Sequence, residues 1–183
     1  PESELIIDIT KDLLFDGMKV LDLGCGSGCI GISLYKENPN ISLFLADFSK
    51  KAIRISKKNA AELKTECELI HSFLFANISG KFDLIVTNLP YISKGDFFFL
   101  QKEIILYEPH EALYGGVSGL DAIKLFLSAV DRYLNENGVF VIEFGKGQDL
   151  LLKKELLKVN FENFEFHQDF NKVKRLVCVK KDT

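Results

Sequence analysis

The sequence lacks several features that would define a protein class. It has no apolar run near the ~18 residues that a membrane-spanning helix needs, and no signal peptide. Its four cysteines include no C-x-x-C pair, which argues against disulfides and a structural zinc and favours a reducing cytoplasm. Its three histidines are scattered, so we expect no metal site. The net charge of −3 lacks the basic footprint of a nucleic-acid partner.

The composition is that of a globular chain. Of 183 residues, 47% are apolar and 27% are charged, which is enough for one domain with a full core and too little for two ordinary domains. We therefore treat residues 1–183 as a single domain. Because the chain begins with Pro1 and not with methionine, we expect it to be a fragment of a longer protein.

Helical and strand patterns alternate along most of the chain. An amphipathic helix is predicted over 4–15, and further helices over 30–38, 49–63, 119–137 and 149–159. Strands are predicted over 19–25, 42–47, 67–72, 82–88 and 139–144, and two more, over 164–170 and 175–181, should form an antiparallel hairpin at the sheet edge. The order indicates a doubly wound α/β domain with a mostly parallel sheet and helices on both faces.

A glycine-rich turn follows the first predicted strand. The stretch "LDLGCGSG" has glycines at 24, 26 and 28, where the backbone can turn tightly and a ligand can approach it closely. The N–H groups of the next helix favour an anionic group there. Asp47 ends the second strand 23 residues after Gly24, a position from which a carboxylate can accept both ribose hydroxyls. Phe48 can pack against an adenine, so the spacing predicts an adenosine-containing ligand.

This pair of features resembles the S-adenosylmethionine site of the Rossmann-like methyltransferases. The resemblance runs from residue 19 to about 180 and includes the terminal hairpin. It implies a seven-stranded sheet and S-adenosyl-L-methionine as cofactor. The expected cofactor-binding residues are Leu23, Gly24, Cys25, Gly26, Gly28, Asp47, Phe48, Phe73, Leu74 and Asn88.

The stretch "NLPY" at the end of the fourth strand resembles the Asn-Pro-Pro-Tyr motif of methyltransferases that modify planar nitrogens. The resemblance implies that the side-chain oxygen of Asn88 and the main-chain carbonyl of Leu89 hold the two N–H bonds of an amide or amino group. Pro90 fixes the kink and offers no competing donor, and Tyr91 packs on the planar group. Asn88, Leu89, Pro90 and Tyr91 are therefore the candidate catalytic residues.

Other segments resemble the release-factor glutamine methyltransferases. They are "PESEL" (1–5), "ILYEPHEALYGGVSGLDAI" (105–123), "IEFGKGQ" (142–148) and "DFNKVKRLV" (169–177). The family implies methylation of the glutamine in the Gly-Gly-Gln motif of peptide chain release factors by a cytoplasmic enzyme. We expect it to be a monomer without direct contact to nucleic acid or membrane.

Three departures from that family stand out. Leu89 replaces the first proline of the motif, and Phe73 stands where many relatives have an aspartate near the adenine. We expect the helical amino-terminal domain that binds the release factor in this family to lie outside this fragment, and residues 1–16 only to lead into the catalytic domain. Three alternatives stay open: a ribosomal-protein glutamine methyltransferase, an adenine-amino methyltransferase of nucleic acids, and a cofactor-binding module without catalysis.

Overall fold

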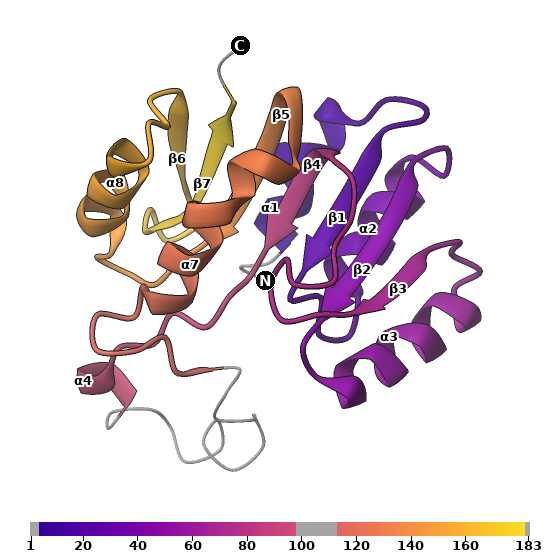
Figure 1. Cartoon of the computed structure of the whole chain (residues 1–183), viewed down its shortest axis with the longest axis horizontal. Helices are drawn as coiled ribbons and strands as arrows, with labels where there is room; N and C mark the ends of the chain where they lie inside the picture. Colours follow the sequence, from indigo (N-terminus) through magenta and orange to yellow (C-terminus); the bar gives the residue numbers. More distant parts are fainter. Residues whose placement is uncertain (1–3, 98–112, 182–183) are drawn as a thin grey trace.

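A seven-stranded sheet forms the centre of the molecule (Figure 1). The computed structural model describes residues 4–97 and 113–181. The strand order is β3-β2-β1-β4-β5-β7-β6. The strands are β1 (Lys19–Leu23), β2 (Ser42–Asp47), β3 (Glu68–His71), β4 (Phe82–Thr87), β5 (Leu134–Glu143), β6 (Phe164–Gln168) and β7 (Lys174–Lys180). The first five pair in parallel, whereas β7 runs antiparallel to both β5 and β6. The expected mostly parallel sheet with a terminal hairpin is confirmed.

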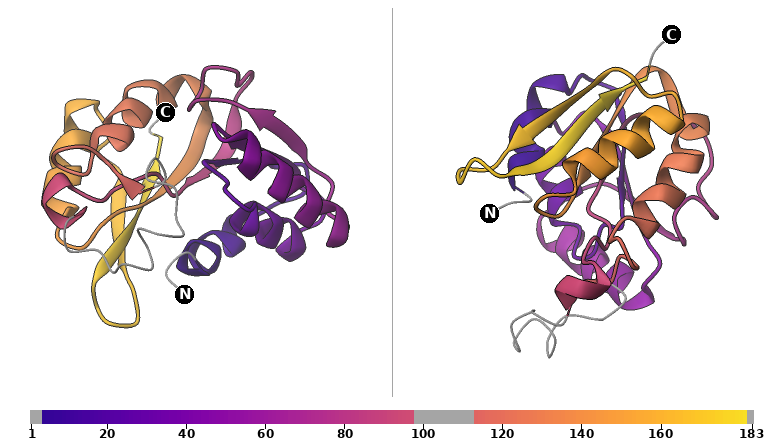
Figure 2. Two further views of the ribbon diagram at one scale, coloured as in Figure 1. Left: turned by 90° about the horizontal axis from the view of Figure 1, so that it is seen from below. Right: turned by 90° about the vertical axis from the view of Figure 1, so that its left-hand side faces the viewer.

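Helices cover both faces of the sheet, as the two views in Figure 2 show. The helices are α1 (Glu4–Thr10), α2 (Cys29–Glu37), α3 (Lys50–Glu62), α4 (Lys94–Phe97), α7 (Asp121–Val130) and α8 (Asp149–Lys158), with short 3-10 turns η1 (Lys11–Leu13) and η2 (Asp131–Tyr133). Ser49 caps α3 as expected, because its hydroxyl accepts the N–H of Ala52. None of the described helices is long and apolar enough to cross a membrane.

Each face of the sheet has its own hydrophobic core. Successive strand residues point to opposite faces, so Leu21 and Leu23 join the core under α7 and α8, while Val20 joins the core under α1 and α2. In the first core, aromatic rings from α7 and β5 pack edge to face, as in the pair Phe126 and Phe140 at 5.5 Å between centroids. These two cores hold the sheet rigid beneath the loops at its carboxyl edge.

The prediction of a helix over 119–137 was wrong at its end. The helix stops at Val130, and Leu134 already pairs with Phe82 as the first residue of β5. A register shift in the β4–β5 pairing accommodates the residues between Leu134 and Val139, and Asn137 takes a left-handed φ of 60°. Leu134 is fully buried, and a buried leucine is common both at a helix end and at a strand start, so its apolar character could not distinguish the two. Gly138 therefore lies within a strand and does not close a helix.

The sheet also determines where a ligand can bind. The chain passes from β1 to β2 on one side of β1, and β4 pairs with the other side of β1. The loops that follow β1 and β4 therefore lead away in opposite directions. In open α/β sheets, the crevice outside the carboxyl ends at such a switch point is the usual binding place. Leu23 at the end of β1 pairs with Thr87 at the end of β4, and the predicted site segments follow these two residues directly.

Candidate functional site

The glycine turn after β1 adopts the conformation that its sequence predicts. Gly24, Gly26 and Gly28 have φ values of 76°, 55° and 79°. At Gly26 no atom lies within 4 Å of the position that a Cβ would occupy, so that face of the turn is open to a ligand. At Gly28 a Cβ would lie 3.1 Å from Ser56 and Ile32. The turn therefore combines an open backbone with close packing against α3.

Asp47 joins the ends of β1 and β2. Its carboxylate is 6% exposed, with Oδ2 accepting the N–H of Gly26 at 2.9 Å and Oδ1 accepting the N–H of Ser49 at 2.7 Å. A carboxylate offers about four lone-pair positions, so each oxygen can still accept a further hydrogen bond. The two backbone donors hold the carboxylate still, and the remaining positions fit a pair of hydroxyl groups.

A second acid, Asp22, lies in β1 just before the turn and was missed by the sequence analysis. It is 1% exposed, and its Oδ2 accepts the N–H of Gly31 at 2.9 Å, while Oδ1 has no hydrogen-bond partner among the described residues. Burial raises the pKa of Asp22 to about 7, against the hydrogen bond from Gly31, and the nearby charge of Asp47 adds to the rise. The sequence signal that could have identified Asp22 is an acidic residue inside a strand that is otherwise apolar.

The Asn-Leu-Pro-Tyr segment follows β4 and lies beside the glycine turn. Thr87 anchors its start, because the Thr87 hydroxyl donates to the carbonyl of Leu23 at 2.6 Å. Asn88 is half-buried, and its main-chain oxygen is 3.7 Å from the Cβ position of Gly24. Tyr91 is also half-buried, and its hydroxyl donates to Oε1 of the buried Glu143 at 3.1 Å. The predicted catalytic segment and the predicted cofactor turn are thus in contact.

The end of this segment is paired to a distant stretch of chain. Ile92 and Tyr114 form a parallel bridge, in which the N–H of Ile92 donates to Leu113 and the N–H of Gly115 donates to the carbonyl of Ile92. A Cβ on Gly115 would lie 2.6 Å from the carbonyl oxygen of Pro90. A residue with a side chain would therefore separate the two stretches.

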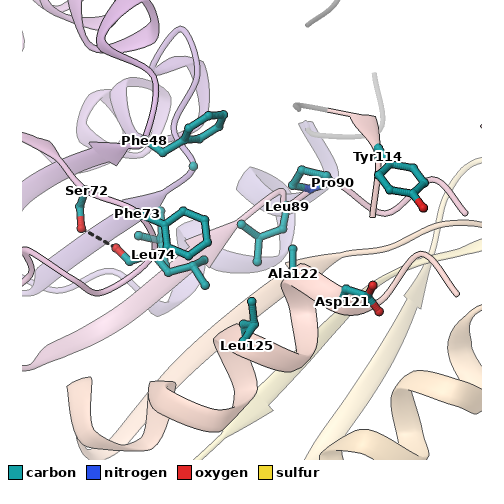
Figure 3. A pocket seen from close by; sticks show the side chains of 12 residues that line it. Phe48, Ser72, Phe73, Leu74, Leu89, Pro90, Tyr114, Asp121, Ala122 and Leu125 are labelled. Atoms are coloured by element: carbon teal, nitrogen blue, oxygen red, sulfur yellow. Dashed lines mark hydrogen bonds between the residues drawn. The ribbon is translucent and has the colours of Figure 1, made fainter. Parts of the chain in front are cut away.

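A cavity of about 330 Å³ opens next to the turn (Figure 3). One wall comes from the ends of β2 and β3, and the other comes from the segment after β4 and from α7. Its lining residues are Leu23, Gly24, Phe48, Ser72, Phe73, Leu74, Leu89, Pro90, Tyr114, Asp121, Ala122 and Leu125. The volume falls in the usual range for small-molecule sites, and the walls are mostly apolar. Such a slot suits a flat, largely apolar group.

The structure places half of the ten predicted cofactor residues at this one cavity. Leu23, Gly24, Phe48, Phe73 and Leu74 line it, and the side chains of Phe48 and Phe73 are 45% and 64% exposed. The Ser72 hydroxyl donates to the carbonyl of Leu74 at 2.7 Å, which holds this loop in place.

The remaining predicted residues are adjacent. Cys25, Gly26 and Gly28 form the turn itself, and Asp47, at the end of β2, accepts the N–H of Gly26. Asn88 follows β4 and is not among the lining residues of the cavity. Burial raises the pKa of the Cys25 thiol, so this cysteine is no ready nucleophile. Leu89 and Pro90 line the cavity, whereas Tyr91 is not among its lining residues. The sequence analysis did not predict the five lining residues Ser72, Tyr114, Asp121, Ala122 and Leu125. The block around Glu108 and Pro109 lies outside the described residues.

Comparison with known proteins gives consistent matches. The family model described as "Methyltransferase small domain" matches residues 2–116. A release factor glutamine methyltransferase from Geobacter sulfurreducens is 34% identical over 177 residues, covering 96% of this chain and 62% of the relative. One from Borreliella burgdorferi is 39% identical over 165 residues, covering 88% of this chain and 56% of the relative. The chain thus spans less than two thirds of the length of these curated relatives.

A solved structure has the same fold. The T. thermophilus 16S rRNA N2 G1207 methyltransferase, in complex with AdoMet and guanosine, superimposes with a TM-score of 0.72 at 20% identity. The match covers 99% of this chain and 43% of that chain. At this identity the likeness concerns the fold alone, which is the Rossmann-like fold of the S-adenosylmethionine-dependent methyltransferases.

Proposed function

Since the chain belongs to the methyltransferase small domain family, we propose that it transfers a methyl group from S-adenosylmethionine to the side-chain amide nitrogen of glutamine in the Gly-Gly-Gln motif of peptide chain release factors. The observation that carries the proposal is that the segment starting at Asn88 lies beside the glycine turn at the switch point, where Leu23 pairs with Thr87 and the Asn88 main-chain oxygen is 3.7 Å from the position that a Cβ on Gly24 would occupy. The names of the relatives support the choice of substrate.

The residues at the site fit the cofactor. The open face of Gly26 and the helix that follows it suit the amino-acid end, and the spare lone pairs of Asp47 suit the ribose hydroxyls. The apolar walls that include Phe48 and Phe73 suit the planar base. When bound, S-adenosylmethionine supplies a methyl group on a positively charged sulfur.

The chain's own contribution to the chemistry is positioning. An amide nitrogen is a poor nucleophile because its lone pair is delocalised into the carbonyl. The side-chain oxygen of Asn88 and the main-chain carbonyl of Leu89 would accept hydrogen bonds from the two N–H groups of the substrate amide. This would orient the nitrogen lone pair towards the methyl group. Pro90 has no N–H that could compete for these acceptors, and Tyr91 would pack on the amide from the place where Glu143 holds it. Such orientation can lower the barrier to methyl transfer by several kcal/mol.

The test is direct. The 183-residue chain is incubated with methyl-labelled cofactor and purified release factor, and mass spectrometry then locates the label. We expect the label on the glutamine of Gly-Gly-Gln and none on a release factor in which that glutamine is alanine. Parallel reactions contain ribosomal protein or adenine-containing oligonucleotides in place of the release factor. Preferential labelling of either would refute the proposed substrate and favour the corresponding alternative.

A further inference from the structure

Gln148 lies between three loops and bonds to all of them. It precedes α8, and the residue is 8% exposed. Its Oε1 accepts the N–H of Gly145 at 2.8 Å, and its Nε2 donates to the carbonyl of Tyr91 at 2.8 Å and to the carbonyl of Ser118 at 3.3 Å. One side chain therefore ties together the loop after β5, the segment after β4 and the stretch before α7.

A carboxamide is the group that these contacts require. The three partners present one N–H and two carbonyl oxygens, so the side chain must accept and donate at the same time. Glutamate would accept from Gly145 but could not donate to Tyr91 or Ser118. Methionine, of similar length, would leave all three groups without their partner, and buried polar groups without partners are destabilising.

The surrounding backbone closes around this amide. Gly119 has a φ of 75°, and a Cβ there would lie 2.3 Å from both Nε2 of Gln148 and the carbonyl oxygen of Tyr91. At Gly145 a Cβ would lie 3.0 Å from Oε1 of Gln148 and 3.2 Å from the ring of Tyr91. Glycine at these two positions lets three chain segments meet at one side chain.

The contacts of Gln148 lie apart from the cofactor residues. Its side-chain hydrogen-bond partners are Gly145, Tyr91 and Ser118, and none of them belongs to the glycine turn or lines the cavity. Tyr91, however, is three residues from Asn88 on a segment whose other end is fixed at Thr87. Holding the carbonyl of Tyr91 therefore limits how Asn88 and Leu89 can move.

We propose that Gln148 is a positioning residue for the methyl transfer: its amide fixes the segment Asn88–Tyr91 at the distance and angle from the glycine turn that the acceptor nitrogen needs. The inference rests on the proposed function. According to this inference, glutamine at position 148 is needed for the rate of the transfer step and not for cofactor binding.

The test compares Gln148→Glu and Gln148→Met with wild type in a single-turnover assay with release factor. We expect the transfer rate to fall about 10- to 100-fold, because a displacement of about 1 Å at the reacting group has an effect of this size. Affinity for S-adenosylhomocysteine, measured by calorimetry, should fall by a smaller factor than the transfer rate, because Gln148 bonds to no residue of the glycine turn or the cavity and reaches the cavity only through the segment that carries Leu89 and Pro90.

A matched control separates positioning from general destabilisation. Leu156→Val in α8 truncates a fully buried apolar side chain of the core beneath this helix and removes none of the hydrogen bonds of Gln148. If it melts at the same temperature as a Gln148 variant and is equally slow, the positioning role is overturned. A large loss of S-adenosylhomocysteine affinity in both Gln148 variants would overturn it as well.

Hydrogen exchange gives a readout that does not depend on the substrate. Peptides covering 88–97 and 113–119 should exchange faster in the Gln148 variants, whereas peptides covering 19–47 should keep their protection. Unchanged exchange in 88–97 would contradict the inference even if activity fell. A wild-type chain that methylates no release factor would refute the proposed function separately, since the exchange pattern would still show whether Gln148 orders the segment.

Discussion

The buried carboxyl of Asp22 should make the stability of the cofactor-free protein depend on pH. Its pKa is about 7 when folded, against an ordinary value of 3.8. Because the folded value is raised, the folded state holds the proton more tightly than the unfolded state does. The stability that the protonated form contributes is complete below pH ~4 and is lost as the pH rises through about 7.

The magnitude follows from the gap between the two pKa values. A gap of about three pH units, at ~1.4 kcal/mol per unit, corresponds to about 4 kcal/mol lost above pH 7. At pH 5 only the part between the ordinary pKa and pH 5 is lost, which is roughly 1–2 kcal/mol. Asp22→Asn keeps an acceptor for the N–H of Gly31 and removes the charge. The increase in the free energy of unfolding of Asp22→Asn over wild type should therefore be about 2–3 kcal/mol larger at pH 8 than at pH 5.

Urea unfolding of both proteins at the two pH values measures this difference. Asp12→Asn serves as the control, because Asp12 is exposed and its substitution should have the same small effect at pH 5 and pH 8. If Asp22→Asn changed the free energy of unfolding equally at both pH values, the carboxyl would have to be ionised at pH 5 already. The burial of Asp22 would then not raise its pKa, and the reasoning would fail.

Further substitutions address the site itself. Asp47→Ala should weaken binding of S-adenosylhomocysteine by about 1–3 kcal/mol, since it leaves hydrogen-bonding groups unpaired; unchanged affinity in calorimetry would refute the role of Asp47. Asn88→Ala should slow methyl transfer about 100- to 1,000-fold with the cofactor still bound, by analogy with oxyanion-hole donors, while Leu89→Pro should keep the rate or raise it modestly in the same single-turnover assay. If Leu89→Pro abolished transfer and Asn88→Ala retained it, the amide-holding mechanism would be wrong. Gly119→Ala should slow transfer as the Gln148 variants do, because a Cβ there overlaps the Gln148–Tyr91 contact; a rate equal to wild type would contradict that contact.

Local sequence patterns carried much of the fold and part of the site. Strand ends followed by glycine or by Asn-x-Pro are local signals, so Gly24, Asp47 and Asn88 could be placed at the carboxyl edge before any coordinates were known. The seven-stranded architecture and the methyltransferase family were also predicted, and both are confirmed. The architecture could be predicted because strand and helix patterns depend on residue spacing within single strand–turn–helix units, whereas the family was implied by the resemblance of the quoted motifs.

The remaining features depend on contacts between distant segments. Leu134 could end a helix or begin a strand, and only its pairing with Phe82 decides between the two. Two of the three side-chain partners of Gln148 lie 30 and 57 residues away along the chain, so no local pattern marks it as a residue that joins loops. The cavity wall from α7 is likewise formed by tertiary packing, and Leu125 could not be told from an ordinary surface leucine.

The pairing of β1 with β4 has a mechanical consequence. Every predicted cofactor residue except Asn88 comes from residues 23–74, and every predicted catalytic residue comes from 88–91, so donor and acceptor sides belong to different stretches of chain. These two stretches meet through the four register pairs of the β1–β4 ladder and through the hydrogen bond from Thr87 to Leu23. Under the proposed function, this ladder of backbone bonds sets the spacing that the methyl group must cross. A substitution that distorted the β1–β4 pairing would lengthen the distance between the donor side and the acceptor side, while the conformation of each side stayed the same.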